Sequence, residues 1–248
     1  MLPPPIGPAL TLPQLERAQL RELTQDDFPA WMKLRDEVLA GLPHRDIYVR
    51  EDDEAAFLAQ HSLPQGHCIG VFVDAELVAY AMLGMPALGD SEHLGAVIGM
   101  APDEQVCVSH LASCMVRSAW RGKQLQALLL KLRYALAQAY HRPLCLAMVS
   151  LHNAASRRNL LAQGMWIDWT GDIDGLQRHV LRIDLQRRPQ WDLQDSRLIA
   201  GDDFAQLRAA AAQGYVGVEQ LADGPRWLLR YVRRLPDALA PAHGAVPL

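Results

Sequence analysis

The segment Val116–Tyr140 reads VRSAWRGKQLQALLLKLRYALAQAY and decides the fold. An apolar strand ends at Val116, and a basic turn with Arg121, Gly122 and Lys123 leads into a Leu-rich helix. The apolar side chains of that helix recur on one face, at Leu125, Leu128, Leu129, Leu132, Leu136 and Ala139. A strand followed by a turn and a helix points backbone N–H groups and the positive end of a helix dipole the same way. The pattern predicts an anion site, with a solvent-exposed first turn of a surface helix as the alternative.

The residues around this segment predict a mixed α/β domain. Apolar runs predict strands at 19–23, 66–73, 76–84, 106–116, 144–149, 165–170 and 179–185, and helical spacing predicts helices beginning near residues 24, 51 and 153. Asp74 and Ala75 predict a tight hairpin between two of the strands. Residues 85–105 are rich in Gly, Pro and acids and predict a long irregular excursion. We therefore expect an α/β fold whose central sheet is mixed, mostly antiparallel and twisted, and is flanked by helices.

The composition argues against several classes of protein. The chain has 248 residues and a formal net charge of -4 at pH 7, which argues against a nucleic-acid partner held by phosphate charge. No apolar run reaches the about 18 residues of a membrane span, and the start MLPPPIGPALTLP does not resemble a secretory signal. The four cysteines lack CxxC spacing and are interpreted as buried thiols. We expect a cytoplasmic protein without a metal or a membrane anchor.

Two segments together resemble the GNAT superfamily of acyl-CoA N-acyltransferases. In VRSAWRGKQLQALLL, Val116, Arg121 and Gly122 fall in register with that family's coenzyme A loop. The loop has a strand ending in Val, four residues, and then Arg-Gly-x-Gly-x-Gly/Ala opening a helix. In NAASRRNLLAQGM, Asn153 and Gly164 match the family's Asn-x-x-Ala-x-x-x-Tyr-x-x-x-Gly-Phe helix. Two motifs in the right order, with a strand between them, make the resemblance fairly specific.

The resemblance implies an enzyme that transfers an acyl group, most simply acetyl, from acyl-CoA to a primary amine. The acceptor would be a small molecule or a peptide. The implied coenzyme A site consists of Met115, Val116, Arg121, Gly122, Lys123, Gln124, Leu125, Gln126 and Asn153. The acidic stretch REDDE at 50–54 would suit a polyamine or an aminoglycoside, but an acidic helix start explains it more simply.

Three departures from the family pattern leave a second function open. Gln124 and Gln126 occupy the positions of the two later loop glycines, and Leu160 stands where the family often has a Tyr acid. The alternative is a degenerate GNAT domain that binds acyl-CoA as a regulatory or partner-binding module without turnover.

His110, six residues before Val116, is the candidate catalytic base. Acyl transfer needs a neutral amine, and an imidazole of pKa near ~6.5 accepts protons at neutral pH. The two residues share a strand face but lie ~20 Å apart along the strand, so a bulge or a water chain must close the distance. Asp103 and Glu104 at the strand's entrance are substitutes for His110. A strand histidine satisfied by a backbone carbonyl is the other interpretation.

We expect three parts in the chain: a Pro-rich arm at 1–18, a GNAT-like domain at 19–185 and a small helical C-terminal extension at 186–248. The extension shows two helical patterns, at 202–214 and 225–235, whose apolar faces are too small to form a core alone. It should therefore pack on the GNAT-like domain or on a second subunit, which leaves a homodimer open. No internal repeat of fixed period is expected.

Overall fold

The computed structural model describes residues 18–235 and 240–241, so the predicted Pro-rich arm lies outside the described residues except for Ala18. The chain forms two compact units. Among the described residues, the first contains 18–90 and 109–142, and the second contains 91–108, 143–235 and 240–241. The boundaries expected at residues 18 and 185 stay a prediction.

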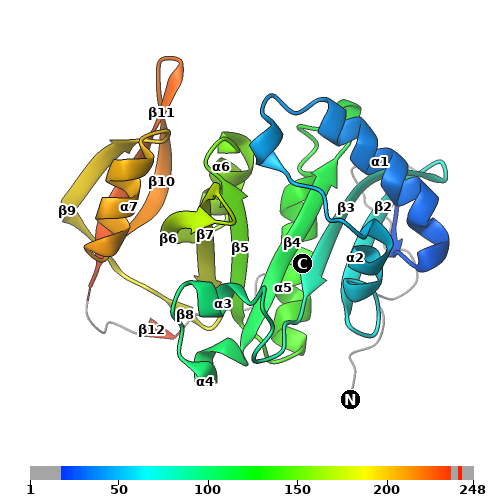
Figure 1. The fold of residues 1–248 in the computed structure, drawn as a ribbon, viewed down its shortest axis with the longest axis horizontal. Helices are drawn as coiled ribbons and strands as arrows, with labels where there is room; N and C mark the ends of the chain where they lie inside the picture. Colours follow the sequence, from blue (N-terminus) through cyan, green and yellow to red (C-terminus); the bar gives the residue numbers. More distant parts are fainter. Residues whose placement is uncertain (1–17, 236–239, 242–248) are drawn as a thin grey trace. The chain divides into compact units, whose positions relative to one another are not determined.

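The first unit is an antiparallel sheet with helices on both faces (Figure 1). Its strands, in sheet order, are β1 (Ala18–Glu22), β2 (Gly66–Val73), β3 (Glu76–Gly84) and β4 (Val108–Val116). Its helices are α1 (Phe28–Ala40), α2 (Glu54–Gln60) and α5 (Leu125–Ala139), with short 3-10 turns at Gln25–Asp27, Arg45–Ile47 and Ser118–Trp120. Trp31 and Leu34 of α1 and Leu58 of α2 pack on one face of the sheet. The predicted hairpin is confirmed, with both Asp74 and Ala75 at positive φ.

The second unit is also built on antiparallel pairs. Its main strands, in sheet order, are β5 (Leu144–Ser150), β7 (Leu176–Asp184), β6 (Trp166–Ile173), β10 (Tyr215–Asp223), β11 (Arg226–Arg234) and β9 (Trp191–Ala200). Its helices are α3 (Leu94–Val97), α4 (Pro102–Gln105), α6 (Ala154–Ala162) and α7 (Phe204–Ala212), and β8 (Arg187–Arg188) pairs with β12 (Ala240–Pro241). Because β10 pairs with β6, the C-terminal extension packs on the segment that precedes it, which was one of the two expected outcomes.

The second helix predicted in the extension is wrong. Residues 226–234 form β11, not a helix. Leu229 and Tyr231 are fully buried while Arg230 between them is partly exposed, which is the period of two of a strand. Asp223 and Gly224, just before the strand, are typical of a hairpin turn. The apolar residues after them have helical spacing, and that spacing favoured the wrong prediction.

The expectation of no repeat is also wrong. Helix α7 lies 50 residues after α6 at both ends, and β11 lies 50 residues after β7 at both ends. Strands β9 and β10 end 50 residues after β5 and β6. Few side chains are identical at this offset: Ala155 and Ala205, Arg158 and Arg208, and the AQG triplets at 162–164 and 212–214. The repeat is therefore carried by the backbone and is faint in the sequence.

Candidate functional site

The backbone of the turn between β4 and α5 leaves open space beside Gly122. Gly122 has φ +77° and Gln124 has φ +59°, both in the left-handed region. A Cβ built on Gly122 would meet no atom within 4 Å. The N–H of Leu128 donates to the Gln124 carbonyl at 3.0 Å. The N–H groups of the residues just before Leu128 therefore belong to the first turn of α5 and point out of the N-terminus of the helix. The turn has the backbone geometry of an anion site.

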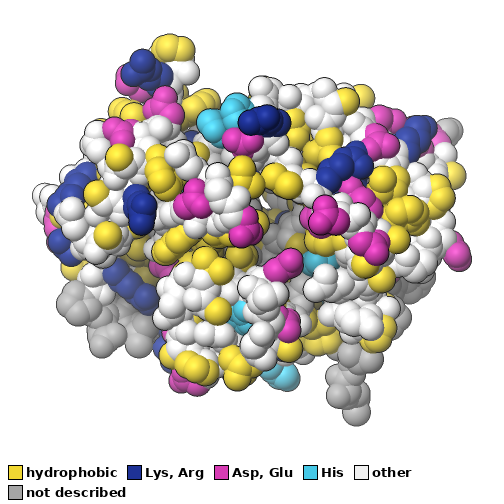
Figure 2. Space-filling model, in the orientation of Figure 1, with side chains coloured by type: hydrophobic (Ala, Val, Ile, Leu, Met, Phe, Trp, Pro, Cys, Tyr) yellow, Lys and Arg dark blue, Asp and Glu magenta, His cyan; other side chains and the backbone are white. Residues whose placement is uncertain are grey.

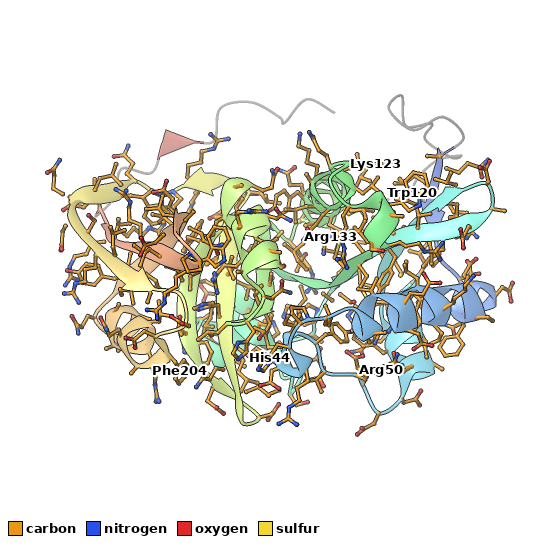
Figure 3. All side chains as sticks on the ribbon, turned by 90° about the horizontal axis from the view of Figure 1, so that it is seen from above. His44, Arg50, Trp120, Lys123, Arg133 and Phe204 are labelled. Atoms are coloured by element: carbon orange, nitrogen blue, oxygen red, sulfur yellow. The ribbon has the colours of Figure 1, made fainter. Side chains whose placement is uncertain are left out.

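Two cationic side chains stand exposed at the rim of this turn. Arg121 donates its Nε to the Val116 carbonyl at 3.3 Å, which ties the end of β4 to the turn. The Nζ of Lys123 lies 4.2 Å from the centroid of the Trp120 ring, and Figure 3 shows these two side chains near each other at the start of α5. Their charges add attraction for a phosphate to the backbone donors.

The helix behind the turn is fixed to the sheet by buried side chains. Leu125 and Leu129 are buried, and Arg133 is 2% exposed. Arg133 donates to the Met82 carbonyl of β3 at 3.2 Å and to the Leu129 carbonyl of its own helix at 3.3 Å. Of the predicted site residues, Leu125 and Met115 have buried side chains, so they would contact a ligand through backbone atoms.

Strand β4 carries a bulge between His110 and Val116. Its register with β3 slips opposite Met82, where β4 places two residues, Ala112 and Ser113. A bulge leaves one residue outside the hydrogen-bond ladder and bends the strand. A bulge is one of the two ways, beside a water chain, in which the distance between His110 and Val116 could be closed.

A buried polar network anchors the bulge to α1. The hydroxyls of Ser113 and Tyr80 lie 2.7 Å apart, and Arg35 donates to the Tyr80 hydroxyl at 3.1 Å. Arg35 is fully buried and also binds Glu51 at 2.8 Å and Glu54 at 2.6 Å. Burial raises the pKa of the Tyr80 hydroxyl well above its usual value, so it stays a neutral hydrogen-bonding group. The network holds Ser113, and with it the bulge, in one geometry.

Charges of both signs cover the surface beside this network, as Figure 2 shows for the region of α1 and α2. Glu54 binds Arg50 at 3.2 Å as well as Arg35, and Arg50 also binds Asp36. Asp53 accepts from the N–H of Ala56 at 2.9 Å and caps α2. The acidic stretch at 50–54 therefore serves as a helix start with arginine partners, as the simpler interpretation predicted.

Two histidines flank one glycine near the start of β4. His110 pairs with Gly84 across the sheet. A Cβ built on Gly84 would lie 3.2 Å from His61 Nε2 and 3.5 Å from His110 Cβ. His61 Nδ1 lies 2.9 Å from the Phe57 carbonyl, which can only accept, so in the neutral ring Nε2 is the basic nitrogen. Sequence reasoning missed His61 because it follows α2 without any motif around it.

The remaining predicted residues lie in the second unit. Asn153 caps α6, where its Oδ1 accepts from the N–H of Ser156 at 3.1 Å. Leu160 is buried, and Glu104 binds Arg182 at 3.1 Å. The structure thus brings together residues 115–126 in the first unit, while Asn153 belongs to the other unit.

The expectation that the cysteines are buried thiols is confirmed for two of the four. None of the four cysteines is in a disulfide; Cys68 and Cys145 are buried, and Cys107 and Cys114 are partly buried. Among the described residues, no helix is both long enough and apolar enough to cross a membrane.

The comparisons with known proteins identify the fold. Neither the family models nor the curated protein sequences match the chain. An N-acetyltransferase from Staphylococcus aureus Mu50 matches in structure with a TM-score of 0.51 and 14% identity, over 68% of this chain and 99% of that one. The fold is that of the GNAT N-acetyltransferases. A second structural match is yncA from Salmonella typhimurium, a proposed acetyltransferase solved with its cofactor acetyl-CoA. It has a TM-score of 0.51 and 18% identity, over 68% of this chain and 94% of that one. The GNAT fold predicted from two motifs is confirmed over about two-thirds of the chain.

Proposed function

We propose that the protein is an acyl-CoA-dependent N-acyltransferase that transfers an acyl group, most simply acetyl, to a primary amine of a small molecule or peptide. The observation that carries the proposal is the β4–α5 turn. Its glycine at φ +77° has open space where a Cβ would stand, and two exposed cations lie beside it. A pyrophosphate needs such a combination of close backbone approach, N–H donors and positive charge.

Coenzyme A would be held at this turn by the backbone from Arg121 to Gln126, with the side chains of Arg121 and Lys123 on its phosphates. When bound, acyl-CoA supplies the activated thioester. Val116 and Met115 would contribute main-chain atoms along β4. Gln124 already has the left-handed backbone that the family's glycine would adopt there, so its side chain does not prevent the turn from forming.

The bulge of β4 provides a place for the acyl group. A main-chain N–H at Ala112 or Ser113 that is released from the ladder would stabilise the negative charge that develops on the acyl oxygen. The amine nitrogen then bonds to the acyl carbon while the carbon–sulfur bond breaks. A thiol of pKa near ~8.5 leaves readily as thiolate and can take its proton from water. Leu160 in place of a tyrosine is compatible with this course.

His110 would accept the proton of the amine, directly or through water. It lies two residues from Ala112, which is about 7 Å along a strand. If the acyl group lies at the bulge, the distance that the proton must cross is this one and not the ~20 Å to Val116. A single bridging water can span it. His61, with its basic Nε2 beside the same glycine, is a second candidate for the same step.

The experiment has two stages. Thermal unfolding is followed with acetyl-CoA and with free CoA, and thiol release is then measured with a panel of primary amines. Stabilisation by ligand together with amine-dependent thiol release supports the proposal. Stabilisation without release for any amine would favour the binding module instead, and the absence of stabilisation would contradict both.

A further inference from the structure

Residues 194–234 repeat the backbone of residues 144–184 at an offset of 50. Asn153 and Asp203 cap α6 and α7 in the same way, each accepting from the N–H three residues later, at 3.1 and 3.0 Å. Each helix is followed by a glycine in the left-handed region, Gly164 at φ +90° and Gly214 at φ +79°. Both helix ends are therefore built identically.

The strand pairings repeat at the same offset. Ile167 pairs with Leu181, and 50 residues later Gly217 pairs with Tyr231. Directly after these pairs both hairpins slip by one residue, so that the same bulge occurs twice. The β9–β11 pairs from Ser196 to Ala200 are likewise β5–β7 pairs shifted by 50. A shared bulge and a shared register over three strands indicate a duplication, because bulges are specific features of a family's backbone.

The two copies meet through equivalent residues. Strands β6 and β10 are antiparallel, and the residues paired between them are Ile167 and Gly217. A residue that pairs with its own equivalent marks a two-fold axis, as in the interface between two identical subunits. A Cβ on Gly217 would lie 2.8 Å from Ile167 Cδ1 and 3.1 Å from Ile167 Cβ, so the close approach requires the glycine.

The junction between the copies is buried and hydrogen-bonded. Arg157 of α6 is 1% exposed and donates its Nε to Gln220 Oε1 of β10 at 2.8 Å. The hydroxyls of Thr170 and Tyr231, also from opposite copies, lie 3.3 Å apart and are both buried. Burial lowers the pKa of Arg157 to about 10, so a desolvated cation is built into the junction. Such a junction resembles the core of a permanent interface rather than a transient contact.

We propose that the second copy takes the place of a partner subunit, so that the chain is a fused pseudo-dimer of its own β5–α6–β6–β7 motif. An uncovered β6 edge would present unpaired backbone groups to another chain. Strand β10 of the same chain covers that edge instead. The second copy has no counterpart of the β4–α5 turn, since only residues 185–190 separate β7 from β9. It is a built-in partner, not a second catalytic domain.

The test uses the full-length chain with Ile167→Cys and Gly217→Cys combined. Their Cβ atoms would be close to the about 3.5–4.5 Å of a disulfide, so mild oxidation should link the two strands within one chain. The expected product is a monomer by size exclusion with light scattering, with a disulfide between positions 167 and 217 by peptide mapping. The matched control joins Ile167→Cys to Gly224→Cys at the tip of the β10–β11 hairpin and should not link.

A disulfide that joins two chains at these positions would overturn the proposal, because the β6 edge would then be paired by a second molecule. A double variant that unfolds like the parent but does not link would overturn it as well. Should the double variant fail to fold, hydrogen exchange of the unmodified protein decides the question. Amides of residues 166–173 should be protected equally at low and high protein concentration, whereas protection that appears only at high concentration would refute the fused pseudo-dimer.

Discussion

Replacing Gly122 with alanine should separate the stability of the β4–α5 turn from its use as a phosphate site. At φ +77° an L-residue costs about 1–2 kcal/mol. The lower entropy of the unfolded chain returns about 0.4–1 kcal/mol. No atom lies within 4 Å of the new methyl group, so no steric cost is added. The free energy of unfolding should therefore fall by only about 1 kcal/mol, which lowers Tm by about 2–4 °C in a chain of this size.

The effect on coenzyme A binding should be larger. The methyl group would stand in the open front of the turn and prevent a pyrophosphate from reaching the N–H groups. Losing one charge-assisted hydrogen bond costs about 1.5–3 kcal/mol, which is a rise of about 10- to 150-fold in Kd. Calorimetry with free CoA and with acetyl-CoA measures this rise, and differential scanning fluorimetry measures the change in Tm.

Gly175 provides the matched control for this variant. It lies in the β6–β7 hairpin at φ +76°, and a Cβ there also meets no atom within 4 Å. Gly175→Ala should lower Tm as much as Gly122→Ala but leave the Kd for CoA unchanged. If both variants lost the same stability and bound CoA equally well, the turn would be an ordinary helix start and the reasoning from its open backbone would be refuted.

Three further predictions concern charge and protons. Arg121→Glu should weaken CoA binding by more than about 10-fold, because it sets a negative charge against the phosphates, whereas Arg226→Glu on an exposed strand end should not; equal affinities in calorimetry would count against the site. His110→Ala should lower kcat and remove an acidic limb near pH ~6.5 from the rate profile, while the affinity for CoA stays intact. If His110→Ala kept wild-type turnover across that range and His61→Ala lost turnover instead, His61 would be the group that accepts the proton. Burial, with a smaller contribution from a neighbouring cation, lowers the pKa of His179 to about 3 from 6.5. Between these values the unfolded chain binds a proton that the folded chain does not, so stability should fall as pH drops from 6.5, by up to about 1.4 kcal/mol per pH unit. Denaturant unfolding of His179→Asn should show a shallower loss than wild type over this range, and an identical slope would contradict the assignment.

The sequence was sufficient wherever one local rule decides the structure. The apolar face from Leu125 to Ala139 predicted α5, and the apolar run before the basic turn predicted β4. It was insufficient where two periods compete. In β11, Trp227, Leu228 and Tyr231 show helical spacing, and pairing with β10 and β9 decided in favour of a strand.

The candidate site was only partly predictable for a different reason. Its main-chain turn is local in sequence, whereas the histidine pair arises because pairing of β3 with β4 places Gly84 opposite His110 and leaves room beside His61. The network from Arg35 through Tyr80 to Ser113 joins residues far apart in the chain. No spacing rule applied to a single sequence reports such contacts.

The duplication also bears on how the chain avoids misfolding. Two hairpins with the same backbone in one chain can exchange strands while they fold, as repeats in multidomain proteins do. At equivalent positions the first copy pairs Trp169 with Val180, and the second pairs Glu219 with Arg230 in an ion pair of 2.9 Å. An exchange of β7 for β11 would set Arg230 at the site where Val180 is fully buried, and would leave the exposed Glu219 without its ion-pair partner. Burying an unpaired charge costs several kcal/mol, so the divergence of these two pairs directs each strand to its own hairpin.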